Sequence, residues 1–300
     1  MFDRIHHAGI AIKDLGIAQD VFTKGLGLLV DTTRSPLPNG NLQRGADPTD
    51  ILDVPIGGME LELNAPPVDG STPGGTHRFI ENRGGVGALH HICLHSDNVP
   101  DDVAHLRASG LTQLESPENQ KKEPWNEVTF FHPRDCLGIL LEIWRTEKHR
   151  VDDNYQGAGV FTGMHHIGIV TDDLEKARHF WCNIIGLRVD TTRSQTLKGG
   201  RLIENDNVKI LNIPLGKDSG EIVAISPQDG SSGTANFLEK YGGKAQGTMH
   251  HISLETADVR SAIDFVEGNG LKRIGDVTDE SAWIHPSSAG GVLIQIVKKT

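Results

Sequence analysis

The chain has 300 residues, of which 37% are hydrophobic and 23% charged, and its formal net charge at pH 7 is −11. This length suits two ordinary domains or one duplicated domain, and the acidic balance argues against a nucleic-acid partner. No apolar run approaches the roughly 18 residues that cross a bilayer, and no secretory signal follows Met1. The three cysteines lack metal-type spacing, which is typical of a reduced, cytoplasmic protein.

The residue pattern of the first quarter predicts one strand, one helix and three further strands. Asp14 is the expected N-cap of a helix that runs to about Lys24, where Gly25 and Gly27 end it. Strands are expected at 10–12 before this helix and near 28–32, 49–54 and 59–64 after it. The second quarter repeats the order, with a helix from about 100 to 109 and strands at 91–95 and near 111–115, 127–132 and 138–144. The predicted unit is therefore βαβββ.

An internal repeat runs through the whole chain. A His-His doublet opens an apolar run four times, at residues 6–7, 90–91, 165–166 and 250–251. The segment Asp31-Thr32-Thr33-Arg34-Ser35 recurs 159 residues later as Asp190-Thr191-Thr192-Arg193-Ser194. Repeats of this kind indicate a duplicated structural unit. We therefore predict a duplication of a duplication, with a polar linker near 147–159 and domains at 1–150 and 160–300.

These motifs resemble those of the vicinal oxygen chelate superfamily, and the resemblance covers essentially the whole chain. The motifs are the His-His-x-Gly-Ile strand start, the Asp-Leu helix start, the Gly-Leu after the helix, and His-Pro-x-x-x-x-Gly-x-Leu-Leu-Glu at a module end. The superfamily includes glyoxalase I, methylmalonyl-CoA epimerase, extradiol dioxygenases and bleomycin-binding proteins, and the pattern is most similar to the first two. The resemblance implies an α+β fold of four βαβββ modules in two tandem domains, each a curled mixed sheet that forms a cup.

The resemblance also implies a metal site in the domain at 1–150. Its ligands would be His7, Glu62, His91 and Glu142, although Glu60 lies on the same strand face as Glu62. Two imidazoles and two carboxylates suit one divalent ion of zinc, nickel, cobalt, manganese or iron. Such an ion would leave positions open for a small-molecule substrate with vicinal oxygens.

The domain at 160–300 departs from this ligand pattern. The matching positions are His166, Val223, His251 and Gln295. Val223 cannot ligate, and the amide of Gln295 replaces a carboxylate, although Glu221 two residues before Val223 could substitute. We therefore interpret the set His166, Glu221, His251 and Gln295 as a degenerate second site.

Several assignments stay open on the sequence alone. The first His of each doublet alternates to the opposite strand face and is interpreted as structural. Arg34 and Arg193 could bind an anionic substrate or form ion pairs within the sheet. The modules could pair with their sequence neighbours or could swap, and neighbour pairing is favoured because it assembles one complete ligand set. A homodimer is left open, and neither nucleic acid nor a membrane is an expected partner.

Three functions follow from the resemblance. The favoured one is a divalent-metal-dependent isomerase, epimerase or lyase of the glyoxalase type. It would abstract a proton next to a carbonyl and stabilise a metal-bound enediolate, with Glu62 and Glu142 as ligands and acid/base groups. The first alternative is an extradiol dioxygenase of a catecholic substrate, which the replacement of a carboxylate by Gln295 disfavours. The second is a non-catalytic small-molecule binder, which the intact first ligand set disfavours.

Overall fold

The computed structural model describes residues 2–44, 47–69, 74–114, 128–145, 159–194, 200–216 and 219–299. The strands before residue 150 are β1 (Ile5–Ala11), β2 (Asn41–Gln43), β3 (Thr49–Ile56), β4 (Met59–Ala65), β5 (Ala88–Ser96), β6 (Gln113–Leu114), β7 (Val128–Phe131) and β8 (Leu140–Arg145). The later strands are β9 (Phe161–Thr171), β10 (Arg201–Ile203), β11 (Val208–Pro214), β12 (Glu221–Pro227), β13 (Gly247–Thr256), β14 (Arg273–Ile274), β15 (Ser281–Ile284) and β16 (Leu293–Lys298).

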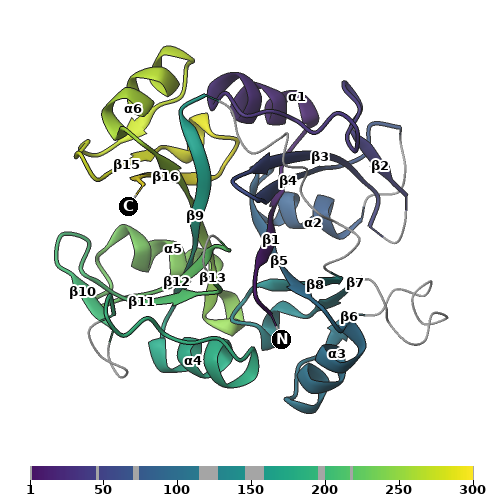
Figure 1. The fold of residues 1–300 in the computed structure, drawn as a ribbon, viewed down its shortest axis with the longest axis vertical. Coiled ribbons are helices and arrows are strands. Elements are labelled where there is room, and N and C mark those ends of the chain that lie inside the picture. Colours follow the sequence, from purple (N-terminus) through teal and green to yellow (C-terminus); the bar gives the residue numbers. More distant parts are fainter. Residues whose placement is uncertain are drawn as a thin grey trace. The chain divides into compact units, whose positions relative to one another are not determined.

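These strands form two eight-stranded sheets of mixed parallel and antiparallel strands (Figure 1). The orders are β2-β3-β4-β1-β5-β8-β7-β6 and β10-β11-β12-β9-β13-β16-β15-β14. The two orders are the same, which confirms the fold of four βαβββ modules in two tandem domains. Within each sheet the strands come from sequence-neighbouring modules, as predicted. The domain bounds 1–150 and 160–300 stay a prediction, because the linker residues 147–158 lie outside the described residues.

The predicted helices are present, and the first starts at its predicted cap, Asp14, whereas the cap of α3, Asn98, was not predicted. Asp14 accepts a hydrogen bond from the Ile17 amide at 2.8 Å, and Asn98 accepts one from the Asp101 amide at 3.3 Å. Such caps satisfy amides that a helix N-terminus leaves without partners. The helices of the four modules are α1 (Leu15–Ala18) continued by η1 (Gln19–Gly25), α3 (Val99–Ala108), α4 (Leu174–Arg178) continued by η5 (His179–Ile184), and α6 (Val259–Gly268).

Two features differ from the sequence prediction. The strand predicted near 28–32 is wrong, because Asp31 accepts hydrogen bonds from the amide and hydroxyl of Thr33 and the chain turns there. The strand that follows the first helix is instead β2. Two helices were also not predicted, α2 (Gly75–Asn82) and α5 (Gly233–Tyr241). Short 3-10 turns complete the described elements, namely η3 (Pro133–Asp135), η6 (Gly243–Ala245) and η7 (Pro286–Ser288).

The chain also divides into two compact units, each assembled from segments that are distant in sequence. One unit comprises Met1–His6, His91–Arg150 and His166–His250. In this unit the Ile5 amide donates to the Ser219 carbonyl at 3.0 Å, and His105 Nε2 lies 2.8 Å from the Ile184 carbonyl oxygen. These bonds join the second and third modules to each other and to the first strand.

The other unit comprises His7–His90, Val151–His165 and His251–Thr300. Here the turn after η1 packs against α6: Gly27 has φ +70°, and a Cβ at this position would lie 2.9 Å from the Phe265 ring. Only glycine combines that backbone conformation with so close an approach. In the described part of the chain, no helix combines the length and the apolarity that crossing a membrane requires.

Candidate metal centre

The first pair of predicted ligands lies on two neighbouring parallel strands. His7 is on β1 and Glu62 is on β4, where Gly9 pairs with Glu62 and His7 with Glu60. The His7 Nε2 and Glu62 Oε2 atoms are 3.8 Å apart, and the two side chains are 0% and 12% exposed. Asn64 Nδ2 donates to the other oxygen, Glu62 Oε1, at 3.0 Å. The strand register therefore brings one imidazole and one carboxylate together, with one carboxylate oxygen held by an amide.

The second pair lies on the parallel strands β5 and β8. His91 Nε2 is 3.4 Å from Glu142 Oε2, and both side chains are buried. Glu142 is in register with Cys93 on one side and with Phe130 on the other. The ring of Phe130 stands edge-on to His91 with centroids 6.0 Å apart. The carboxylate and the imidazole thus lie against apolar neighbours, where ionised groups need a charged or metal partner.

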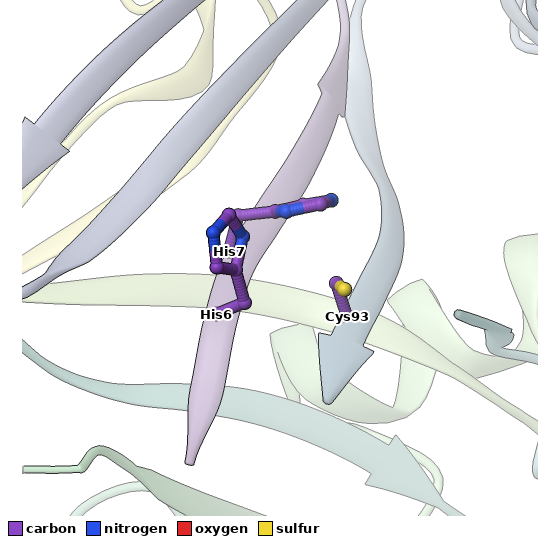
Figure 2. A group of neighbouring side chains, drawn as sticks. All are labelled: His6, His7 and Cys93. Atoms are coloured by element: carbon purple, nitrogen blue, oxygen red, sulfur yellow. The ribbon is translucent and has the colours of Figure 1, made fainter. Parts of the chain in front are cut away.

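Three groups of side chains in the described residues bring ligand atoms within 4.8 Å of one another. One contains the predicted ligands His91 and Glu142. Another contains His6, His7 and Cys93, which Figure 2 shows on strands β1 and β5. The third contains His165, His166 and Glu221.

The two glutamates on β4, Glu60 and Glu62, have different partners, and Arg34 is the partner of Glu60. Its guanidinium donates to Asp31 at 2.8 Å from Nε and to Glu60 from both terminal nitrogens, and Nη1 lies 3.8 Å from Asp53. Glu60 is therefore engaged in an ion pair, whereas Glu62 faces His7. The structure answers the open question about Arg34, since the residue binds carboxylates of the chain itself.

Burial strongly perturbs the acids around Arg34. The pKa of Glu60 is raised to about 8, chiefly by burial and next by the neighbouring Asp53 carboxylate, and Arg34 opposes both effects. Burial also raises the pKa of Asp53, against the favourable charge of Arg34. Three carboxyl groups, those of Asp31, Asp53 and Glu60, surround this guanidinium, and a fourth, that of Glu62, acts electrostatically on Asp53. This excess of acid over base suits a site that takes up a cation.

The family model for the Glyoxalase/Bleomycin resistance protein/Dioxygenase superfamily matches residues 6–130 and 165–285. The chain belongs to this superfamily. Human mitochondrial methylmalonyl-CoA epimerase is 30% identical over 140 residues, which cover 47% of this chain and 72% of that protein. Ethylmalonyl-CoA/methylmalonyl-CoA epimerase of Cereibacter sphaeroides is 27% identical over 143 residues, covering 48% of this chain and 98% of that protein. These relatives are enzymes, which supports an enzymatic role for this chain.

A solved structure extends the likeness to the whole chain. A mutant of 4-hydroxymandelate synthase from Streptomyces coelicolor has a TM-score of 0.67 and covers 100% of this chain and 93% of its own. The identity is 11%, so this likeness shows the fold alone. The superfamily membership therefore rests on the family model and on the epimerase relatives.

In the second half, Arg193 makes the same ion pairs as Arg34, but no carboxylate stands at the position that corresponds to Glu62. Arg193 donates to Glu221 at 2.6 and 3.0 Å and to Asp190 at 2.6 Å, as Arg34 does to Glu60 and Asp31. Glu221, proposed from sequence as a substitute ligand, is thus the counterpart of Glu60. Two carboxyl groups surround this guanidinium, because the remaining two positions hold an amide, Asn212, and an apolar residue, Val223.

The remaining residues of the predicted second site, His166, His251 and Gln295, lie on the strands β9, β13 and β16. Val223 packs in an apolar cluster with Val208, Ile210 and Ile225, in strands β11 and β12. His166 and His251 are buried at 8% and 3% exposure, and Gln295 is half-buried. The predicted second site stays a prediction, although its single carboxylate is already ion-paired.

Sequence reasoning missed the acids and amides that surround the first ligand pair. Asp53 pairs in register with Glu62, and Ser35 donates to Asp53 Oδ2 at 2.6 Å. A signal was present, because Ile51-Leu52-Asp53 recurs as Ile210-Leu211-Asn212, which places an acid opposite the predicted ligand in one half only.

Proposed function

We propose that the chain is a divalent-metal-dependent isomerase or epimerase of the glyoxalase type, which moves a proton on a carbon next to a carbonyl. The observation that supports it is the presence of two imidazole–carboxylate pairs, His7 with the half-buried Glu62 at 3.8 Å and His91 with the buried Glu142 at 3.4 Å. The proposed ligands of a single ion are these four residues. The epimerase relatives provide the second line of support.

The residues fit a divalent cation by donor type and by charge. Imidazole nitrogens and carboxylate oxygens together suit zinc, nickel, cobalt, manganese or iron. Glu60 is unsuited to be the fourth ligand because Arg34 holds both of its oxygens. When bound, the ion would supply positive charge to the substrate oxygen on which negative charge develops.

Glu62 and Glu142 are the proposed base and acid of the proton transfer. In the proposed reaction one carboxylate accepts the proton from the carbon next to the carbonyl, and the carboxyl group of the other returns a proton to that carbon. The low exposure of both side chains, 12% for Glu62 and 7% for Glu142, excludes most bulk water from the reacting carbon. Asn64 holds Glu62 through Oε1 at 3.0 Å, and Glu62 Oε2 lies 3.8 Å from His7 Nε2.

Metal analysis of the purified protein tests the ligand set. We expect about one divalent ion per chain, and we expect Glu142→Gln to lose most of it. Glu221→Gln is the matched control, because it changes the glutamate that Arg193 binds in the other half. It should leave the metal content unchanged. Wild-type protein without metal after purification and reloading would contradict the proposal.

Solvent exchange tests the reaction. Wild-type protein in deuterated buffer should incorporate deuterium next to the carbonyl of a thioester such as methylmalonyl-CoA, or of a hemithioacetal, whereas Glu142→Gln should lose at least two orders of magnitude in rate. Oxygen uptake with a catechol and no deuterium incorporation would assign the site to ring cleavage instead.

A further inference from the structure

Three polar side chains lie on one face of strand β4, and the last of them is an amide. Glu60, Glu62 and Asn64 alternate along the strand, so their side chains point to the same side of the sheet. Arg34 donates to Glu60, whereas Asn64 donates to Glu62. The two glutamates therefore have donors of different charge, a guanidinium for Glu60 and a neutral carboxamide for Glu62.

The side-chain amide of Asn64 bonds Glu62 at two atoms. Asn64 Nδ2 donates to Glu62 Oε1 at 3.0 Å and to the main-chain carbonyl oxygen of Glu62 at 3.1 Å. Asn64 is itself buried, and its own carbonyl oxygen accepts from the Ile12 amide at 2.9 Å. These bonds restrict the rotation of the Glu62 carboxylate, whose Oε2 lies 3.8 Å from His7 Nε2.

A neutral donor suits a carboxylate that is to bind a cation. An ion pair with arginine offsets the charge of a carboxylate, as it does for Glu60, whereas a carboxamide donates a hydrogen bond and carries no net charge. Asn64 therefore orients Glu62 without cancelling its negative charge. Holding a side chain in place before binding also lowers the conformational entropy that binding removes.

The second half lacks the carboxylate and the amide together. Val223 and Ile225 stand in register at the positions of Glu62 and Asn64. The arginine ion pair of the same strand face is nevertheless present there, through Glu221. Because the ion pair forms in a half that has no such amide, the amide is not needed to build this strand face. Its presence goes instead with the proposed ligand.

We propose that Asn64 is a positioning residue for metal binding, whose carboxamide holds the Glu62 carboxylate in place for the cation and adds no charge of its own. The inference rests on the proposed function, because it takes Glu62 as a ligand. Asn64 acts through Glu62 and not on the ion. Loss of the amide should therefore weaken cation binding only in a chain that has the Glu62 carboxylate.

Calorimetric titration of chelator-treated, full-length protein with Co²⁺ alone tests this dependence. We expect Asn64→Leu to weaken Co²⁺ binding about 10- to 100-fold, the loss that removal of a ligand's hydrogen-bond partner typically causes. Glu62→Ala keeps three of the four proposed ligands and should bind Co²⁺ more weakly but measurably. In that background Asn64→Leu should weaken binding by no more than about twofold, since two residues that act as one unit are not additive.

Ile225→Leu is the matched control, because Ile225 occupies the position of Asn64 in the second half, and it should leave Co²⁺ affinity unchanged. Asn64→Ala is a second variant without the donor, and circular dichroism establishes which variants are folded. Unchanged Co²⁺ affinity in a folded Asn64 variant, or equal losses with and without the Glu62 carboxylate, would overturn the inference alone. Absence of Co²⁺ binding by the wild type, or undiminished binding by Glu62→Ala, would overturn the proposed ligand set as well.

Discussion

The guanidinium of Arg34 governs the electrostatics around the first ligand pair. Its side chain is 27% exposed and serves Asp31, Asp53 and Glu60 at once. Carboxylates that are buried without a cation must either protonate or destabilise the fold. Arg34 is therefore the residue that allows four carboxyl groups to gather in this part of the chain while Glu62 stays directed at His7.

Replacing Arg34 by methionine should destabilise the metal-free protein by about 2 kcal/mol near pH 8, after allowance for its partial exposure. The pKa of Glu60 is raised above its usual 4.5 to about 8, so its stabilising contribution is complete below pH 4.5 and is lost as the pH rises toward 8. Without Arg34 that pKa rises further. The loss of stability should therefore be larger at pH 8 than at pH 5.

Urea unfolding of both proteins at the two pH values, with a chelator present, measures this difference. Arg193→Met is the control, because only two carboxyl groups surround Arg193 and its variant should depend less on pH. An equal loss of stability at pH 5 and pH 8 in Arg34→Met would contradict the expectation.

Among the elements, the first helix depends on its N-cap. Asp14 has extended backbone angles and accepts from the Ile17 amide at 2.8 Å, and Leu15 and Ala18 are the buried residues of α1. Asp14→Ala should cost about 1 kcal/mol in free energy of unfolding, and Asp14→Asn only a few tenths, because asparagine keeps the acceptor. Denaturant unfolding measures both, and equal losses in the two variants would exclude capping as the cause.

The presence or absence of a local sequence signal explains which elements could be predicted. Asp14 and the repeated doublets act locally, through caps and strand alternation, so the sequence predicts the modules and their order. The N-cap position of α2 is occupied by Gly74, which has no side chain to cap the helix, and the apolar alternation of Leu28 and Val30 resembles a strand until Asp31 turns the chain. The sequence carries no capping signal for α2, whereas the signal for the turn is Asp31 itself, and the apolar alternation before it favoured a strand.

Three residues of the candidate site could be predicted from the family resemblance. His7, His91 and Glu142 stand in repeated motifs, so their positions follow from the resemblance. The distinction between Glu60 and Glu62 instead depends on Arg34, which lies 26 residues before Glu60 in the chain. Both glutamates share one strand face, so only the tertiary contacts show that Glu60 binds Arg34 whereas Glu62 Oε2 lies 3.8 Å from His7 Nε2.

For the molecule as a whole, the two halves share one fold and differ in charge at matching positions. Asp53, Glu62 and Glu142 in the first half correspond to Asn212, Val223 and Gln295 in the second. Each of these replacements removes a carboxylate. The two halves therefore share one architecture, whereas the second half lacks a carboxylate at each of these three positions.

We expect a divalent ion that binds the proposed ligands of the first half to stabilise the folded chain against unfolding. A ligand that binds only the folded state adds about 2.7 kcal/mol at a free concentration of 100 times its Kd. We expect added zinc or manganese to raise the unfolding temperature of the wild type, and EDTA to reverse the shift. Glu142→Gln should lose most of the shift, whereas Gln295→Glu, which adds a carboxylate to the second half, should retain it. A full metal-induced shift in Glu142→Gln would show that the stabilising ion lies elsewhere in the chain.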